Sequence, residues 1–200
     1  MNKLSLALVG LTLTLSACQT SSLSETEKTP VATVSTSFTG QHTTVDYSKS
    51  VIAFTGKSSI VDHQGKWTSY GVEITTNPAE PSNLEKATIA IAINLTSVET
   101  DSDGLSKHLM KPDFFDTEKF PTASFVSQSI RKIGDNQYVL AGDLMMKGKT
   151  KPISMNAEIT DTYLVTSFDV PRKDFGIGND TYGEKLLNPL VPVEVKLYFQ

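Results

Sequence analysis

The sequence predicts an all-β domain, an eight-stranded antiparallel barrel with short helices, and three observations lead to this fold class. Between Ile89 and Thr96 large apolar residues alternate with small or polar ones, a period of two that is typical of a strand with one buried face. Turn-forming residues such as Gly134-Asp135-Asn136 separate the strand-like segments. Most connections are short, which favours antiparallel neighbours, and closing the sheet into a barrel removes its exposed edges.

The first residues are expected to be a targeting segment. Met1-Asn2-Lys3 is a short basic start, and the apolar run over residues 4–15 is too short to cross a bilayer comfortably as a helix. Residues 1–17 are therefore interpreted as a lipoprotein signal peptide. The sequence Leu15-Ser16-Ala17-Cys18 resembles the lipobox of bacterial lipoproteins, in which the cysteine becomes the lipidated first residue of the mature chain.

Cys18 is the only cysteine, so an intrachain disulfide and a multi-cysteine metal site are excluded. Lipidation of Cys18 would attach the protein to a membrane, since two or more acyl chains give stable anchoring. Gln19 follows, where Asp usually signals retention at the inner membrane, so the expected location is the periplasmic side of the envelope, at the outer membrane. Residues 18–42, rich in Ser and Thr, are interpreted as the lipidated cysteine and a flexible tether.

The barrel domain is expected over residues 43–200, and its strands follow from the same period of two. Lys147-Gly148-Lys149-Thr150 is a second hairpin signal between neighbouring strands. An eight-stranded barrel is either filled by its own side chains or wide enough for one small ligand. The strand-like segments are residues 51–54, 67–75, 89–96, 122–130, 138–146, 153–159, 163–170 and 191–199.

One stretch, residues 101–116, does not have the strand pattern. Ser102 or Asp103 would cap a short helix that ends near Met110, because Pro112 disfavours helical backbone just before it. The helix would be followed by a turn and by entry into the next strand.

Several motifs follow one another through the domain and together carry a resemblance. They are Asp103 to Leu109, Asp113-Phe114-Phe115-Asp116, Lys119-Phe120-Pro121-Thr122-Ala123-Ser124-Phe125, Gly142-Asp143-Leu144 with Lys147 to Pro152, and Arg172 to Ile177 with Asp174-Phe175-Gly176-Ile177. In their joint order and spacing they resemble the YceI-like family of bacterial secreted proteins, over roughly residues 44–199. The resemblance implies a lipocalin-like barrel with a long apolar interior that binds polyisoprenoids or similar amphiphiles, such as isoprenoid quinones or fatty amides. It implies no catalytic reaction.

Four phenylalanines stand among the charges of the stretch 103–125, where a solvated loop would have no use for them. They either pack in the core or line a ligand tunnel. His108 is either hydrogen-bonded to a nearby backbone or carboxylate group, or it anchors a polar head group. Met145 and Met146 are strand neighbours that point to opposite faces, and one of them either fills the core or adapts to a ligand. The candidate ligand-binding residues are Phe54, Trp67, Leu105, His108, Leu109, Phe114, Phe115, Phe120, Phe125, Met145 and Phe168.

Other functional classes are disfavoured. The net charge of −4 offers no basic field to nucleic acid. Asp101-Ser102-Asp103-Gly104 does not fit a calcium loop, because Met110 falls where a bidentate Glu is needed. The three histidines have no ligand-like spacing, so no metal site is expected. Lysines around residues 147–151 are interpreted as a solvated hairpin, or as a contact for an isoprenyl phosphate or anionic head groups.

The sequence therefore predicts an envelope lipoprotein that sequesters one long-chain isoprenoid or similar amphiphilic lipid in its barrel. No cofactor other than this ligand and no enzymatic activity are expected, and a homodimer is a further expected assembly. Two alternatives stay open. One is an interaction or structural lipoprotein whose barrel is filled, and the other is an enzyme acting on a lipid with His108 as general base.

Overall fold

The structure is a computed structural model that describes residues 44–179 and 186–200. All of these belong to one compact unit, Ser37–Gln200. The expected signal peptide, the expected tether and Cys18 lie outside the described residues. Among the described residues, no helix is long and apolar enough to span a membrane.

The described chain is mostly β, with one short α-helix and three 3-10 turns. The strands are β1 (Val51–Gly56), β2 (His63–Trp67), β3 (Tyr70–Thr75), β4 (Thr88–Asn94), β5 (Val98–Thr100), β6 (Thr122–Gly134), β7 (Gln137–Met146), β8 (Lys149–Ile159), β9 (Tyr163–Pro171) and β10 (Leu190–Tyr198). The helical segments are η1 (Leu84–Lys86), η2 (Leu95–Ser97), α1 (Asp103–Leu109) and η3 (Arg172–Phe175).

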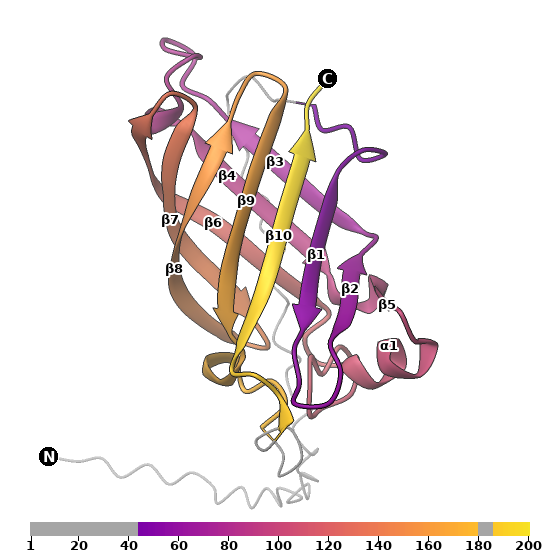
Figure 1. Cartoon of the computed structure of the whole chain (residues 1–200). Helices are drawn as coiled ribbons and strands as arrows, with labels where there is room; N and C mark the ends of the chain where they lie inside the picture. Colours follow the sequence, from indigo (N-terminus) through magenta and orange to yellow (C-terminus); the bar gives the residue numbers. More distant parts are fainter. Residues whose placement is uncertain (1–43, 180–185) are drawn as a thin grey trace, which may run out of the picture. The chain divides into compact units, whose positions relative to one another are not determined.

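All paired strands are antiparallel and form one curled sheet in the order β3-β4-β6-β7-β8-β9-β10-β1-β2-β5. β2 pairs with β5 while β3, the next strand in the chain, pairs with β4. Two backbone hydrogen bonds bridge these ladders, from Thr68 N to Ser97 O at 3.2 Å and from Asn94 N to Ser69 O at 2.9 Å. The hydrogen bonds thus join the two ends of the sheet and close it into a barrel. Figure 1 shows β9, β10 and β1 in front of β3, β4 and β6.

The all-β class is confirmed, but the structure has ten strands where the sequence predicts eight. The strand expected over residues 67–75 is broken, because β2 ends at Trp67 and β3 begins at Tyr70. β4 is likewise separated from β5 by η2, where the side chain of Asn94 accepts a hydrogen bond from the backbone N–H of Thr96. This turn buries Leu95 completely. Counting each interrupted pair as one bent strand restores the eight.

The helix expected near residues 102–110 is confirmed as α1. The Ser102 side chain accepts a hydrogen bond from the Leu105 N–H, which satisfies one of the free donors of the first turn. The chain then folds back on the end of the helix, because Phe115 N donates to Leu109 O at 3.0 Å and Thr117 N donates to Met110 O at 3.1 Å. These bonds place the phenylalanine-rich turn next to α1, at one end of the barrel (Figure 1).

Both expected hairpin turns are confirmed, and one of them explains a predicted site residue. Lys147 and Gly148 connect β7 to β8 with φ values of 49° and 70°. A Cβ at Gly148 would lie 2.8 Å from the Phe120 ring. Glycine is therefore required at this position for two reasons, the left-handed backbone conformation and the close approach of the Phe120 ring. Phe120 packs against this turn.

The core occupies the barrel interior, where one face of each strand meets the others. The largest fully buried side chains are Phe175, Ile52, Leu95, Leu140, Leu164 and Leu197. Burying one such side chain stabilises the fold by about 1.5–3 kcal/mol relative to leaving it exposed. The deep part of the barrel is thus a packed core in the ordinary sense, and the open space lies elsewhere.

Candidate functional site

Two cavities lie inside the barrel and adjoin each other. A larger one of about 400 Å³ lies at the end of the barrel that carries α1, and we call it the mouth chamber. A narrower one of about 60 Å³ lies between the strands, and we call it the inner lumen. Trp67, Met146, Val170 and Val193 line both cavities, so these four residues form the boundary between them.

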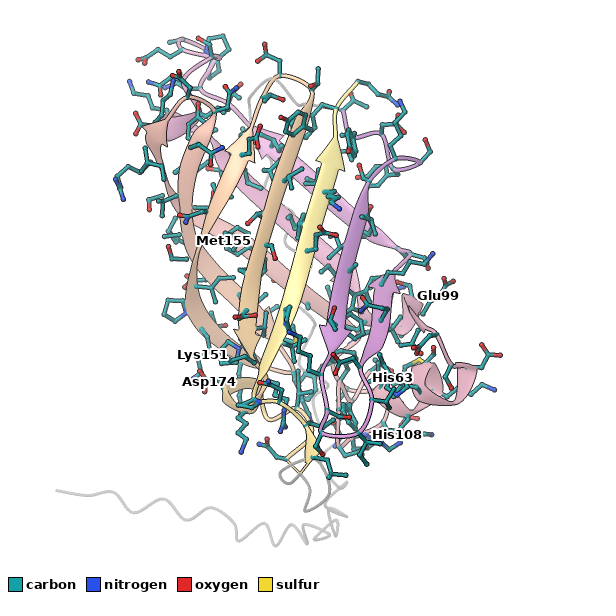
Figure 2. The ribbon with its side chains drawn as sticks, in the orientation of Figure 1. His63, Glu99, His108, Lys151, Met155 and Asp174 are labelled. Atoms are coloured by element: carbon teal, nitrogen blue, oxygen red, sulfur yellow. The ribbon has the colours of Figure 1, made fainter. Side chains whose placement is uncertain are left out.

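Segments far apart in the sequence build the wall of the mouth chamber. The loop between β1 and β2 forms one side, and α1 with its following turn contributes Leu105, Leu109 and Phe114. Val191, at the start of β10, completes the wall with the segment before it. Figure 2 shows His63 and His108, both of which line the chamber, at the same end of the barrel beside α1.

The β1–β2 loop carries the most exposed apolar side chains of the chamber. Ile60 is 73% exposed and Val61 is 51% exposed, and both line the chamber entrance. Backbone hydrogen bonds hold this loop to the segment before β10, from Ser59 N to Leu186 O at 3.0 Å and from Asn188 N to Lys57 O at 2.9 Å. The entrance therefore has an apolar rim whose backbone is held in place by hydrogen bonds.

Three aromatic rings form the inner end of the chamber. The ring centroids of Phe54 and Trp67 are 4.8 Å apart, and those of Trp67 and Phe115 are 6.0 Å apart. The Phe54 ring lies directly on Gly65, where a Cβ would be only 2.2 Å from Cζ of the ring. Gly65 thus lets the ring lie flat against β2 and leaves the chamber open.

We expect Gly65→Ala to reduce the chamber without unfolding the protein. The added methyl group must displace the Phe54 ring, and the ring can move only by turning away from β2 into the surrounding space. An overpacked site of this kind costs about 1–3 kcal/mol. Thermal unfolding should show that loss, and affinity for a lipid ligand should fall with it. Unchanged values for both quantities would mean that the ring position is not set by Gly65.

The polar groups of the entrance include two histidine–aspartate pairs. His108 Nε2 lies 3.2 Å from Asp113 Oδ2, and His63 Nδ1 lies 2.9 Å from Asp101 Oδ1. The His108 ring also meets the edge of Phe114, with centroids 5.0 Å apart. His108 therefore pairs with a carboxylate, as one interpretation expected, and it also lines the chamber, so its role as a head-group anchor stays a prediction. No group of three His, Cys, Asp or Glu in the described chain could hold a metal ion.

Arg172 is a buried cation at the chamber wall, 3% exposed. Its guanidinium donates hydrogen bonds to the backbone carbonyls of four described residues. Nε donates to Asn188 O at 2.9 Å and Nη2 to Leu187 O at 3.0 Å. Nη1 donates to Ile177 O at 2.8 Å and to Gly178 O at 2.7 Å. The side chain therefore ties the turn after η3 to the segment before β10, and both line the chamber.

Lys147 has a similar role on the neighbouring hairpin turn. Its Nζ donates to Pro112 O at 2.7 Å and to Gly176 O at 2.8 Å. Burial lowers the pKa of this lysine, and the carboxylates of Asp116 and Asp113 partly offset the effect. One member of the predicted lysine cluster is thus engaged by backbone carbonyls within the fold.

The inner lumen is lined almost entirely by apolar side chains and is nearly filled. Phe125, Phe168, Met155 and Leu140 contribute to its wall. The sequence left open whether the barrel is filled or hollow, and the structure combines the two. The interior is closely packed at depth and open at the mouth.

The predicted site residues separate into three groups. Those that line the mouth chamber are Phe54, Trp67, Leu105, His108, Leu109, Phe114 and Phe115. Phe125 and Phe168 line the inner lumen, as does Trp67. Phe120 and Met145 line neither of these two cavities.

Phe120 and Met145 lie away from both cavities, so their expected contact with a ligand has no support from the position of either side chain. Phe120 packs against the β7–β8 turn. Met145 is 39% exposed on the outer face of β7, whereas Met146 is buried and lines both cavities. Adjacent strand residues point to opposite faces, so a shift of one position exchanges inside and outside.

Several chamber residues were not anticipated, among them His63, Ile60, Val61 and Arg172. For the rim, the sequence did contain a signal, because Ile60-Val61 stands between polar residues in a hairpin loop, where apolar side chains have no local partner. Arg172 begins the motif Arg172 to Ile177, but its role was not predictable, since its carbonyl partners come together only in the fold.

Comparison with known proteins gives consistent matches. A family model described as YceI-like domain matches residues 43–200. A UPF0312 protein of Shewanella denitrificans is 30% identical over 151 residues, 70% of this chain and 74% of the relative. A UPF0312 protein of Photorhabdus laumondii is 40% identical over 83 residues, and Protein YceI of Escherichia coli O157:H7 is 41% identical over 71 residues. These two matches span only 40% and 37% of the relatives' lengths.

Two solved structures share the fold. BcnA of Burkholderia cenocepacia matches with a TM-score of 0.69 and 21% identity, over 78% of this chain and 99% of that chain. A domain of Saccharophagus degradans described as polyisoprenoid-binding matches with a TM-score of 0.59 and 16% identity, over 78% and 96% of the two chains. At these identities the likeness concerns the fold alone.

Proposed function

The chain belongs to the YceI-like family, and from this premise we propose that it binds a long-chain isoprenoid or a similar amphiphilic lipid inside its barrel. The mouth chamber carries this proposal. Its volume of about 400 Å³ is within the range of small-molecule sites, which are mostly apolar with a few placed polar groups. The Saccharophagus domain of the same fold is described as binding polyisoprenoids.

The chamber would hold the ligand chiefly by burying its hydrocarbon. Each buried methylene contributes about 0.8 kcal/mol, so a long tail binds strongly without many polar contacts. A tail too long for the chamber enters the inner lumen by displacing side chains at the boundary. Met146 and Met155 line that route, and methionine adapts its shape at little cost. The histidines at the entrance would then face the polar head group.

We propose sequestration rather than catalysis. Among the described residues that line the chamber, Ser58 carries the only hydroxyl group, and its Oγ donates to Val61 O at 2.6 Å. A serine nucleophile would instead donate its proton to a base such as a histidine. The lining is mostly apolar, which suits the burial of a hydrocarbon tail.

We further propose that the protein works in the bacterial envelope, attached through lipidated Cys18 on the periplasmic side of the outer membrane. The support is the sequence of the first residues, with its basic start, short apolar run and lone cysteine. A tether of the expected length, residues 18–42, would reach roughly 25–30 Å as a coil. The barrel could therefore receive or deliver its ligand near the membrane that anchors it.

Native mass spectrometry of the exported full-length chain tests the function. Cys18→Ser removes the expected acyl attachment, so that any extracted lipid is a bound ligand. We expect a stoichiometric mass increment that organic solvent extracts as a prenyl or long-chain acyl compound. A bare mass that persists after incubation with quinones and fatty amides would contradict lipid binding. It would favour the alternative of an interaction lipoprotein, for which the nearly filled inner lumen is the supporting observation.

A further inference from the structure

Trp67 occupies a special place between the two cavities. It is the only tryptophan of the chain, it is 5% exposed, and it lines both the mouth chamber and the inner lumen. Phe54 and Phe115 flank its ring. The other boundary residues, Met146, Val170 and Val193, have apolar side chains. Any ligand that passes from the chamber into the lumen must pass this indole.

The indole N–H of Trp67 is buried and has no hydrogen-bond partner among the described residues. A buried tryptophan usually finds a partner for this group, because a donor without one costs about 1–3 kcal/mol of stability. Trp67 lies at the boundary of the mouth chamber, where a ligand can supply the missing partner. An unsatisfied group of this kind calls for an explanation.

The chemistry of the group restricts the partner. Indole Nε1–H only donates, so the ligand atom must be an acceptor. A carbonyl oxygen meets this requirement, and a plain hydrocarbon tail does not. The N–H is closed off from the free space of the chamber, so contact requires a small movement of a neighbouring side chain. Met146, with three rotatable bonds, lines the same boundary.

We propose that Trp67 is the specificity-determining donor of this site and binds a carbonyl oxygen of the lipid at the boundary between the cavities. This inference rests on the proposed lipid-binding function and narrows its ligand class. The site would select long-chain lipids with a carbonyl in the head group, as quinones and amides have, over lipids that lack one. The head group would occupy the chamber with its carbonyl at the inner end beside Trp67, and the tail would continue into the inner lumen.

A matched ligand pair and a matched variant test the inference. The ligands are a long-chain methyl ketone and the alkane of the same chain length, which differ only in the carbonyl. The variant is Trp67→Phe, which keeps an aromatic ring and removes the donor. In the full-length chain we expect the ratio of ketone affinity to alkane affinity to fall about tenfold in the variant, the size of one ordinary hydrogen bond. A quinone and a primary fatty amide, compared in the same way, distinguish the two natural carbonyl classes.

The parent protein gives an independent readout, because it has a single tryptophan and hence a single indole N–H signal in a ¹H–¹⁵N spectrum. We expect the ketone to shift this proton downfield and the alkane to leave it near its ligand-free position. If Trp67→Phe does not fold, this spectrum alone decides the question.

The outcomes separate the inference from the function on which it rests. Binding of both ligands with an equal effect on the indole signal, or an unchanged affinity ratio in the variant, overturns the role of Trp67 and leaves lipid binding intact. If neither ligand, quinone nor amide binds, the proposed function fails and this inference fails with it.

Discussion

Arg172→Met is expected to lower the free energy of unfolding by about 3–5 kcal/mol, a loss typical of breaking a buried charged network. The substitution removes the hydrogen bonds that the guanidinium donates to backbone carbonyls, and it leaves the buried acceptors Ile177 O and Gly178 O without this donor. The segments that these bonds join line the mouth chamber. Ligand affinity should therefore fall together with stability.

Chemical denaturation measured in parallel for three variants checks this prediction. Arg172→Lys keeps the charge but not the planar fork of donors, so its loss should be intermediate. Arg131→Met removes the other arginine of the chain, which is exposed on β6, and should change stability by less than about 0.5 kcal/mol. An Arg172→Met protein as stable as the Arg131→Met control would show that the carbonyl network contributes little.

Filling the mouth chamber is expected to abolish lipid binding while the barrel stays folded. Leu105→Trp combined with Val191→Trp adds bulk at two partly buried positions that line the chamber from opposite walls. Rings added at these lining positions can extend into the cavity and reduce its volume. Excluding about four methylenes of ligand costs about 3 kcal/mol, which corresponds to a loss of affinity of about 100-fold or more.

Titration of the double variant with a long-chain quinone, next to its unfolding curve, gives the answer. Met145→Trp is the matched control, because it adds a comparable side chain on the outer face of the barrel, away from both cavities. It should bind like the parent protein. A folded double variant that still binds at parental affinity would place the ligand outside the mouth chamber.

Local patterns in the sequence correctly predicted most of the elements of the fold. The alternation from Ile89 onward, the hairpin at Gly148 and the helix capped by Ser102 all depend on residues within a few positions of each other. Backbone preferences and side-chain periods act over that distance, so one chain is enough to recognise them.

Contacts between distant segments account for the errors and omissions. The break between Trp67 and Tyr70 lies beside the turn η2 of the partner strands, more than twenty residues away in the chain. Neither of these two segments indicates the break by its own sequence. The choice of Met146 over Met145 as the inward residue depends on the register of β7 in the sheet. A period of two means that neighbouring residues point to opposite faces of the sheet, but it does not determine which of them faces the barrel interior.

The candidate site divides in the same way. The stretch 103–125 was predicted as a site because phenylalanines stand among its charged residues. Four residues of this stretch do line the chamber, namely Leu105, Leu109, Phe114 and Phe115. The opposite wall comes from the β1–β2 loop and the segment before β10. Those residues have no pattern that links them to α1, because only the closure of the barrel brings them together.

The sequence by itself determined that this protein is an antiparallel β-barrel with a helical turn beside one end, since these features follow from local period and capping. Only the tertiary structure decided that the barrel is filled at depth and open at the mouth. Cavity volume is the difference between the space enclosed by all strands and the side chains within it, and no local segment contains that difference. The same holds for the unpartnered indole of Trp67, which becomes visible only when every neighbour is in place.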